Sequence, residues 1–382
     1  MHDVLPLARS TVDPDAVSRP VEGLVSRLLA EPTTQVVLIQ RGLVATRGSA
    51  LDLRAPAEIP RDAWGPDDVV YLGRDDDGAY LALTLPEHLG EERDLDGVPI
   101  VEDAGLVDLV ATLEFRHLRD IGDALPDRDA GLATTAVAVS AWHVRHPRCP
   151  RCGEPTEVID AGWVRRCSAD NSLHYPRTDP AVIMAVTDNQ DRILLGHAAH
   201  WPARRFSTLA GYVEPGESIE AAVAREVKEE AGLEVGSVEF VASQPWPFPA
   251  SLMLGFRARL AESSDGAVKV DGVEITDARF FSREVLASAA RTGGGASPDA
   301  VLHRASPDRG VVRRSDTDGT GRLNGPPTSR PAAPGDTGMT RTVRSMRRSA
   351  RERRISAAGR RHGRPAGPYR TRRRGRDVGA VP

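Results

Sequence analysis

The segment from Gly211 to Leu233, GYVEPGESIEAAVAREVKEEAGL, is the part of this sequence that most limits how the chain can fold. It opens with Gly and Pro residues, which favour a tight loop. Ser218 then fits the N-cap of a helix, and Gly232 fits its C-terminal stop. The sequence therefore predicts a tight loop that leads directly into a helix between Ser218 and Gly232.

Three carboxylates are expected on one face of that helix, because Glu226 and Glu230 are four residues apart and Glu229 lies beside them. Like charges at this spacing repel one another and weaken an isolated helix. A bound divalent cation would remove that cost, and oxygen-only ligands favour Mg²⁺ or Mn²⁺. Such ions neutralise phosphate oxygens and activate water. A solvated acidic helix face is the alternative, and it would be preferred for an isolated EVKEE.

The same segment resembles the Nudix box at every defined position of that motif, which are here Gly211, Glu217, Arg225-Glu226, Val227, Glu229-Glu230, Gly232 and Leu233. The resemblance implies that Glu226, Glu229 and Glu230 bind two or three catalytic Mg²⁺ or Mn²⁺ ions. It also implies that Glu217 and Arg225 form a supporting pair that fixes the loop against the helix. Members of the family cleave a nucleoside diphosphate linked to another moiety.

A second motif, SQPWPFPAS from Ser243 to Ser251, is similar to the hallmark of the NADH pyrophosphatase (NAD diphosphatase) subfamily. The plain alternative is a proline-rich loop that packs Trp246 and Phe248 into a core. The resemblance adds Glu274 to the catalytic metal ligands. It further implies a set of substrate-lining residues, with nucleobase stacking on the two tyrosines: Tyr175, Ile183, Tyr212, Gln244, Trp246, Phe248 and Ser251.

The chain resembles actinobacterial members of this subfamily. The resemblance implies hydrolysis of NADH or NAD⁺ to NMNH or NMN plus AMP. It also suggests removal of NAD caps from RNA, because the same diphosphate bond is attacked, and it implies a homodimer. Two other functions remain open. One is a Nudix hydrolase of another dinucleotide or nucleotide sugar, which the intact SQPWPFP disfavours. The other is a nucleotide-binding protein without activity, which the complete glutamate set disfavours.

A zinc ribbon is expected from the spacing of the three cysteines Cys149, Cys152 and Cys167, with fourteen residues between the last two. A fourth Cys would stand at position 170, which is Asp170. Asp170 fits the spacing, whereas His174 is the more usual type of zinc ligand, so the fourth ligand stays open. We expect one structural Zn²⁺ that stabilises a segment too small for its own core. A redox pair of Cys149 and Cys152 ranks well below zinc.

The composition excludes several classes of protein. No apolar run reaches the length of a membrane span, since the longest candidate, Leu132 to Val144, contains polar residues. The N-terminus has no basic segment followed by an apolar one, so we expect no signal peptide. Three cysteines do not make a secreted disulfide framework. We therefore expect a soluble cytoplasmic protein.

The expected fold class is α+β, with an N-terminal mixed α/β domain over residues 1–145, a zinc ribbon over 146–176 and a Nudix α/β/α sandwich over 177–292. The first domain shows no catalytic constellation, and its His117, His143 and His146 are expected to be structural. Patterning predicts the following elements: strands at 36–40, 69–72, 80–84, 181–187, 192–196, 238–243 and 252–259, a hairpin turn at Asp75 to Gly78, and helices at 106–119 and 131–146.

The C-terminal residues 293–382 differ sharply in composition from the rest. Residues 291–382 hold 22 Arg and 7 acidic residues, while the first 290 residues are strongly acidic. At face value this is a disordered basic arm that could bind nucleic acid. However, residues 296–313 can be back-translated and read one base later as PPPTRSSIARRLIEEWYG, which resembles the usual end of the subfamily. We hypothesise that the chain after about residue 295 is a frameshift product, with the codons of Gly293 to Gly295 as the slip site.

Overall fold

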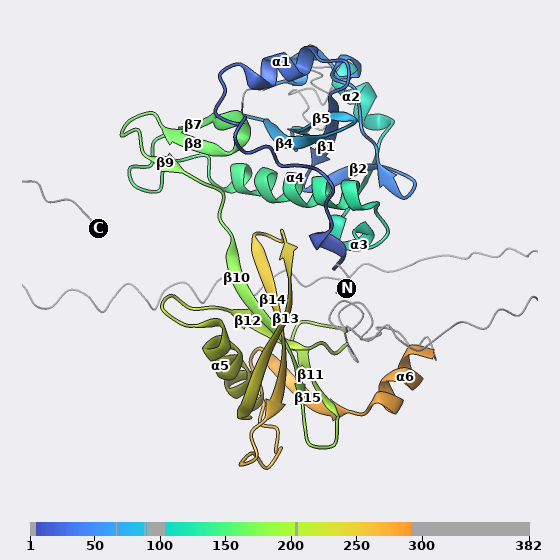
Figure 1. The fold of residues 1–382 in the computed structure, drawn as a ribbon, viewed down its shortest axis with the longest axis vertical. Helices are drawn as coiled ribbons and strands as arrows, with labels where there is room; N and C mark the ends of the chain where they lie inside the picture. The colour runs from blue at the N-terminus through green and yellow to red at the C-terminus, as the bar shows by residue number, and fades with distance from the viewer. Residues whose placement is uncertain (1–4, 66, 88, 90–103, 203–204, 292–382) are drawn as a thin grey trace, which may run out of the picture. The chain divides into compact units, whose positions relative to one another are not determined.

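The computed structural model describes residues 5–65, 67–87, 89, 104–202 and 205–291, which form a mixture of helices and three β-sheets (Figure 1). This mixture confirms the predicted α+β class. The described residues contain no helix long and apolar enough to span a membrane. The predicted disordered tail and its frameshift lie outside the described residues, and the three domain boundaries stay predictions.

The N-terminal region is built on a mixed six-stranded sheet in the order β3-β2-β1-β5-β4, with β6 paired to β2. Strands β1 and β5 are parallel and the other pairs are antiparallel. The three predicted strands and the hairpin turn before Gly78 are confirmed. The strands are β1 (Gln35–Gln40), β2 (Leu43–Arg47), β3 (Ala50–Leu51), β4 (Val69–Asp75), β5 (Gly78–Thr84) and β6 (Glu114–Arg116).

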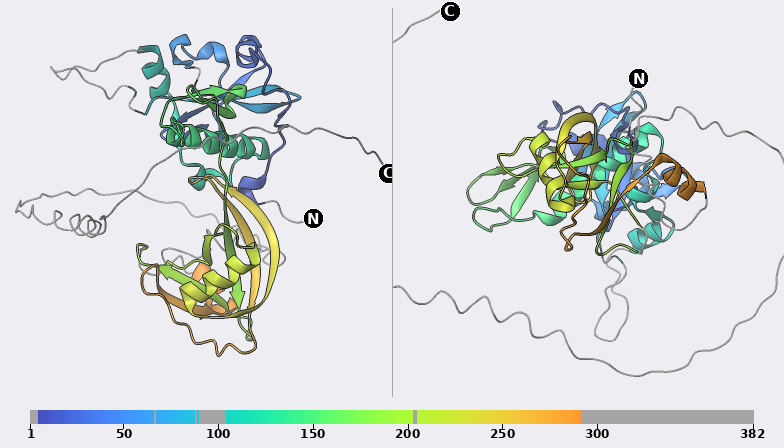
Figure 2. Two further views of the ribbon diagram at one scale, coloured as in Figure 1. Left: turned by 90° about the vertical axis from the view of Figure 1, so that its left-hand side faces the viewer. Right: turned by 90° about the horizontal axis from the view of Figure 1, so that it is seen from below.

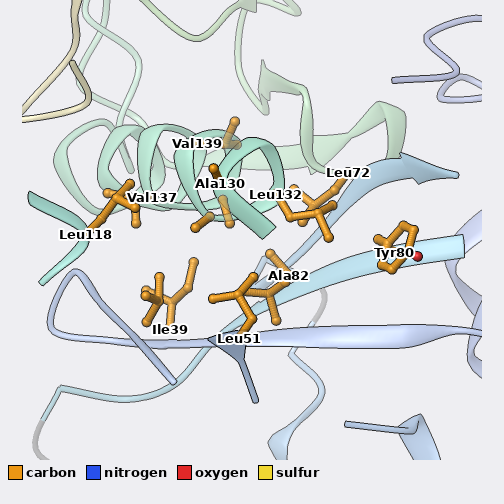
Figure 3. Close-up of a cluster of buried hydrophobic side chains, with 14 of the residues drawn as sticks. Ile39, Leu51, Leu72, Tyr80, Ala82, Leu118, Ala130, Leu132, Val137 and Val139 are labelled. Carbon is orange, nitrogen blue, oxygen red and sulfur yellow. The ribbon is translucent and has the colours of Figure 1, made fainter. Parts of the chain in front are cut away.

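Helices cover both faces of this sheet. Successive side chains of β1 point to opposite faces, so this strand contributes to two separate cores. Val37 and Ile39 belong to the core beneath α4 (Asp127–Arg145), the helix predicted at 131–146. Figure 3 shows apolar side chains of α4 on the side facing the sheet. Val36 and Leu38 belong to a second core that also includes residues of α1 (Leu24–Ala30) and α2 (Ala104–Ala111).

The single helix predicted from Leu106 to Arg119 is wrong. Helix α2 ends at Ala111, the next residues form β6, and a short helix α3 (Leu118–Ile121) follows. Strand β6 pairs antiparallel with β2, and Thr46 Oγ1 donates a hydrogen bond to Glu114 O at 3.1 Å. Pairing with a distant strand therefore overrides the local helical pattern.

The ribbon region consists of three short antiparallel strands, β7 (Thr156–Ile159), β8 (Val164–Cys167) and β9 (Leu173–His174). Four short 3-10 helices complete the elements before the last sheet. They are η1 (Pro6–Ala8), η2 (Pro56–Glu58), η3 (Arg61–Ala63) and η4 (Asp160–Gly162). The two additional views in Figure 2 help to follow these segments along the chain.

The C-terminal described region is a second six-stranded sheet in the order β13-β14-β10-β11-β15, with β12 paired to β10. Helix α5 (Ile219–Ala231) packs on one face, where Val223 and Val227 meet Val182 and Met184. All four strands predicted here are present. The elements are β10 (Asp179–Thr187), β11 (Ile193–Ala198), β12 (Leu209–Tyr212), β13 (Val235–Trp246), β14 (Ser251–Leu260), β15 (Ile275–Phe281) and α6 (Arg283–Arg291).

Candidate active site and zinc ribbon

Helix α5 begins and ends where the sequence predicts. Ser218 is its N-cap, and the Ser218 hydroxyl accepts a hydrogen bond from the Ala221 N–H at 3.2 Å. Gly232 ends the helix with a φ of 72°, a conformation that glycine adopts without strain. These two ends fix the register of the helix and so the directions of its glutamates.

Arg225 joins the loop, the helix and strand β12 through one guanidinium. Its Nε and Nη2 donate to both carboxylate oxygens of Glu217, at 2.8 and 2.9 Å. Its Nη1 donates to Glu226 at 2.8 Å and to Glu229 at 2.9 Å, and Nη2 also donates to Tyr212 O at 2.9 Å. The predicted support of the loop by Glu217 and Arg225 is therefore present as a bidentate ion pair, which holds planar groups firmly.

Gly211 lies on the strand face directly opposite the Glu226 carboxylate. A β-carbon at this position would overlap the carboxylate of Glu226. The absence of a side chain thus lets the backbone of β12 approach α5 closely. This close approach gives a physical reason for the glycine that begins the motif.

Glu230 is the most deeply buried carboxylate of the helix, with only 5% of its surface exposed. Its Oε2 is buried without a hydrogen-bond partner. Burial, followed by the charges of Glu226, Glu274 and Asp271, raises the pKa of Glu230 to about 8. Burial also raises the pKa of Glu226, although Arg225 opposes that shift. A buried carboxylate oxygen without a partner fits a cation ligand.

Glu274 is exposed and lies in a turn that the Asp271 carboxylate holds together. Asp271 accepts hydrogen bonds from the N–H groups of Val273, Glu274 and Ile275 at 2.9–3.2 Å. Sequence reasoning missed the role of Asp271, although its position three residues before Glu274 is a usual signal for such a turn.

The acidic side chains approach one another without meeting at a single point. Within the described ranges, no three of these carboxylates have oxygen atoms that all lie within 4.8 Å of one another. Glu226 and Glu229 are both paired with Nη1 of Arg225. The donor set consists of carboxylate oxygens alone, which suits Mg²⁺ or Mn²⁺.

Several predicted substrate-lining residues share the face of the sheet that points away from α5. Tyr212 pairs with Ala181, two residues from Ile183 on the same strand, and Ser251 pairs with Asp179, so the strand registers place all three side chains on this face. The hydroxyls of Tyr212 and Ser251 are hydrogen-bonded at 3.1 Å. Tyr212 remains 54% exposed, and Tyr175, which follows β9, is 61% exposed.

The SQPWPFP segment is held largely by residues from the N-terminal part of the chain. Gln244 is buried, and its Oε1 accepts a hydrogen bond from the Leu7 N–H at 3.1 Å. Trp246 and Phe248 pack edge to face against each other and against the core beneath α4. The Arg119 guanidinium lies 5.6 Å from the Trp246 ring centre and 5.0 Å from that of Phe248. The two aromatic residues therefore pack against a core as the alternative predicted, although Trp246 ends strand β13 and does not lie in a loop.

The cysteines of the ribbon converge with Asp170. The ligand atoms of Cys149, Cys152, Cys167 and Asp170 all lie within 4.8 Å of one another. The sulfur atoms of Cys152 and Cys167 are 3.5 Å apart. Three thiols and a carboxylate at this spacing fit the size and donor types of a tetrahedral zinc site.

Comparisons with known proteins bear on both sites. Three family models match the chain in order: an NADH pyrophosphatase-like rudimentary NUDIX domain at residues 33–142, an NADH pyrophosphatase zinc ribbon domain at 145–175 and a NUDIX domain at 177–303. The NAD-capped RNA hydrolase NudC of Mycobacterium bovis is 37% identical over 266 residues, which cover 70% of this chain and 77% of that protein. The chain belongs to the Nudix family. Its matched domains place it in the NADH pyrophosphatase group and confirm the predicted family and fold.

Two other relatives show the same relationship. NudC of Mycobacterium tuberculosis gives the same identity and coverage as the M. bovis protein. The human NAD-capped RNA hydrolase NUDT12 is 45% identical over 213 residues, which cover 49% of this chain and 46% of that protein. The chain therefore spans about half the length of the human protein.

Proposed function

We propose that this Nudix hydrolase cleaves the diphosphate bond of NADH or NAD⁺, which gives NMNH or NMN plus AMP. The observation that carries the proposal is the buried, unpartnered Glu230 Oε2 beside Glu226 and Glu274. This arrangement is unfavourable without a cation and suited to one. The two relatives NUDT12 and NudC are NAD-capped RNA hydrolases, which supports extending the substrate to NAD-capped RNA.

Glu226, Glu229, Glu230 and Glu274 would hold the catalytic Mg²⁺ or Mn²⁺ ions. When bound, such ions neutralise the diphosphate oxygens and make a water molecule more acidic. Arg225 orients two of these carboxylates, and Gly211 leaves room for Glu226. Because water is the attacking group, no Ser or Cys nucleophile is required.

The sheet face that carries Tyr212 would bind the substrate. Tyr212 and Tyr175 offer aromatic surfaces for a nucleobase or nicotinamide ring. Ser251 and Ile183 lie close to Tyr212 on the same face. Gln244, Trp246 and Phe248 are less exposed than the two tyrosines. We therefore assign them to the edge of this surface, where they support its shape.

The ribbon would bind one structural Zn²⁺, and its free thiols suit the reducing cytoplasm, where we place the protein. We further propose a homodimer, as the subfamily resemblance implies. Light scattering on the purified chain tests the dimer, and zinc analysis of the same sample tests the metal. A monomer at micromolar concentration, or a zinc content well below one per chain, would contradict these two proposals.

The decisive experiment follows NADH hydrolysis with Mn²⁺ and measures AMP and NMNH for the parent chain and for Glu230→Gln. We expect the variant to lose about 100-fold or more in kcat. Glu220→Gln, an exposed glutamate in the first turn of the same helix, is the matched control and should keep the parent rate.

The remaining outcomes separate the alternatives. Faster turnover of other dinucleotides or nucleotide sugars than of NADH would indicate a different Nudix specificity. If the parent is inactive, the assay is repeated with the reading frame restored after Gly295. Activity of the restored chain would support the frameshift hypothesis, whereas continued inactivity with intact folding would favour the non-catalytic alternative.

A further inference from the structure

The first cysteine turn of the ribbon has a characteristic set of backbone hydrogen bonds. The N–H of Gly153 donates to Cys149 O at 2.9 Å, and the N–H of Cys149 donates to Glu154 O at 2.8 Å. The Arg151 N–H points to Cys149 Sγ at 3.4 Å. Gly153, which directly follows Cys152, has a φ of 83°. The turn thus brings the first and fourth of its residues, Cys149 and Cys152, to the same side.

The second turn repeats this pattern around Cys167. The N–H of Asn171 donates to Cys167 O at 3.1 Å, and the N–H of Cys167 donates to Ser172 O at 2.9 Å. Asn171 has a φ of 58°, in the left-handed region that Gly153 also occupies. In this repeat, Asp170 occupies the position that Cys152 holds in the first turn. The backbone therefore directs the Asp170 side chain as it directs a cysteine ligand.

We propose that Asp170 is the fourth zinc ligand, so that the ribbon is a three-sulfur, one-oxygen site whose zinc is more readily exchanged than in a four-cysteine ribbon. This inference rests on the zinc site proposed above and specifies its ligands. The carboxylate can take the place of a thiolate because Zn–O bonds of about 2.0–2.2 Å are shorter than Zn–S bonds of about 2.3 Å, which offsets the greater reach of an aspartate.

Neighbouring groups already orient the Asp170 carboxylate. Its Oδ1 accepts hydrogen bonds from the N–H of Ser172 at 2.9 Å and from the Ser172 hydroxyl at 2.5 Å. Such contacts are usual for a carboxylate that binds a metal through its other oxygen. Arg151 lies 3.6 Å from Oδ2 and is largely exposed, so it can turn away when that oxygen binds a cation.

His174, the other candidate for the fourth zinc ligand, supports the site and does not bind the metal. Its Nε2 lies 3.1 Å from Ser172 Oγ, which also contacts Cys149 Sγ at 3.6 Å. Ser172 thus stands between His174 and the converging ligand atoms. The histidine lies outside the cluster of four atoms and acts on Asp170 through the serine hydroxyl.

The replacement of a thiolate by a carboxylate has a chemical consequence. Zinc prefers soft thiolate ligands to carboxylate oxygens in ribbons of this type, whereas the formal charge of the site is unchanged. The zinc of this chain should therefore leave faster in the presence of a competing chelator. Replacing Asp170 with Cys should restore the four-sulfur set and slow that release.

The experiment uses the full chain, with Zn²⁺ release to a coloured chelator and the spectrum of the Co²⁺-substituted protein as readouts. We expect Asp170→Cys to release zinc at least about tenfold more slowly, a change of about 1.4 kcal/mol in the barrier. Its Co²⁺ form should show stronger thiolate charge-transfer absorption, as for four sulfurs rather than three. Asp170→Ala should release zinc faster, whereas His174→Ala should have a Co²⁺ spectrum like that of the parent.

Two results would overturn the assignment. One is a parent-like rate and spectrum for both Asp170 variants. The other is a changed Co²⁺ spectrum for His174→Ala with an unchanged one for Asp170→Ala. Failure of the parent chain to bind any Zn²⁺ or Co²⁺ would instead reject the zinc site as a whole. Because Asp170→Cys adds a ligand, the test does not depend on a variant that loses its fold.

Discussion

Gly211 on strand β12 and Glu226 on helix α5 approach so closely that the carboxylate occupies the space of a β-carbon. The two residues lie at the start and the middle of the motif, and their contact sets the distance between strand and helix. Arg225 Nη1 donates a hydrogen bond to the same carboxylate at 2.8 Å. The position of one proposed metal ligand therefore depends on a missing side chain as much as on an ion pair.

The first prediction concerns Gly211→Ala. The new methyl group would meet the flexible end of Glu226, so the carboxylate must move while the fold can remain. We expect kcat for NADH to fall about tenfold or more, with a change in Tm of only a few degrees. Steady-state kinetics and a thermal melt measure the two effects. A large loss of Tm with normal activity in the surviving protein would contradict this account.

The second prediction concerns Arg225→Lys. Lysine keeps the charge but has no planar fork to hold Glu217, Glu226 and Glu229 together. We expect about a tenfold to hundredfold loss of kcat and a higher Mn²⁺ concentration for half-maximal activity. Titration of activity with Mn²⁺ measures both. Lys228→Arg, which changes an exposed cation on the same helix, is the control and should behave as the parent.

The third prediction concerns the stability of the metal-free protein. Burial raises the pKa of Glu230 to about 8, so at pH 8 the metal-free folded chain either buries a charge or holds a proton that the unfolded chain has lost. Glu230→Gln removes this cost and should raise the free energy of unfolding by roughly 1–3 kcal/mol in EDTA at pH 8. Adding Mn²⁺ should stabilise the parent more than the variant, because the variant lacks a ligand. Urea denaturation with EDTA or Mn²⁺ gives both values.

Glu229→Gln is the matched control for that experiment. Its side chain is 59% exposed and paired with Arg225. Losing this exposed pair should change stability in EDTA by less than about 1 kcal/mol. Equal stabilisation by the two variants would show that burial of the Glu230 charge is not the cause.

The sequence predicts the helix and loop of the candidate active site closely because their determinants are local. Ser218 and Gly232 fix the ends of α5 through their own backbone neighbours. Arg225 and Glu217 are also close in sequence, and their pairing follows from the motif. In contrast, the helix wrongly predicted at 106–119 is interrupted by β6, which pairs with β2 more than 60 residues earlier, and local patterning cannot reveal that pairing.

Contacts between distant segments explain what else the sequence left open. The hydrogen bond from Leu7 to Gln244 and the position of Arg119 over Trp246 join residues far apart in the chain. No spacing rule predicts such pairs. The resemblance predicts which residues line the site, whereas only the structure shows that Gln244 is buried and that Tyr212 is exposed.

His143 is buried, and each of its two ring nitrogens has a hydrogen-bond partner, which the sequence does not reveal. Its Nε2 is 2.8 Å from Gly162 O, and its Nδ1 is 2.8 Å from the Arg165 guanidinium. Arg165 can only donate, so Nδ1 must accept and the ring is neutral. Burial lowers the pKa of His143 to about 4. The prediction that His143 is structural is consistent with these contacts.

The fourth prediction follows from this lowered pKa. Between pH 6.5 and 4 the unfolded chain protonates this histidine while the folded chain does not, so stability falls as the pH falls through that window. From pH 7 to pH 5 we expect this group to remove about 2 kcal/mol from the free energy of unfolding. Urea denaturation at both pH values should show a smaller drop for His143→Gln, even if that variant is less stable at pH 7. His146→Gln, a half-buried neighbour, should keep the parent's pH dependence, and an unchanged drop in His143→Gln would assign the effect to other groups.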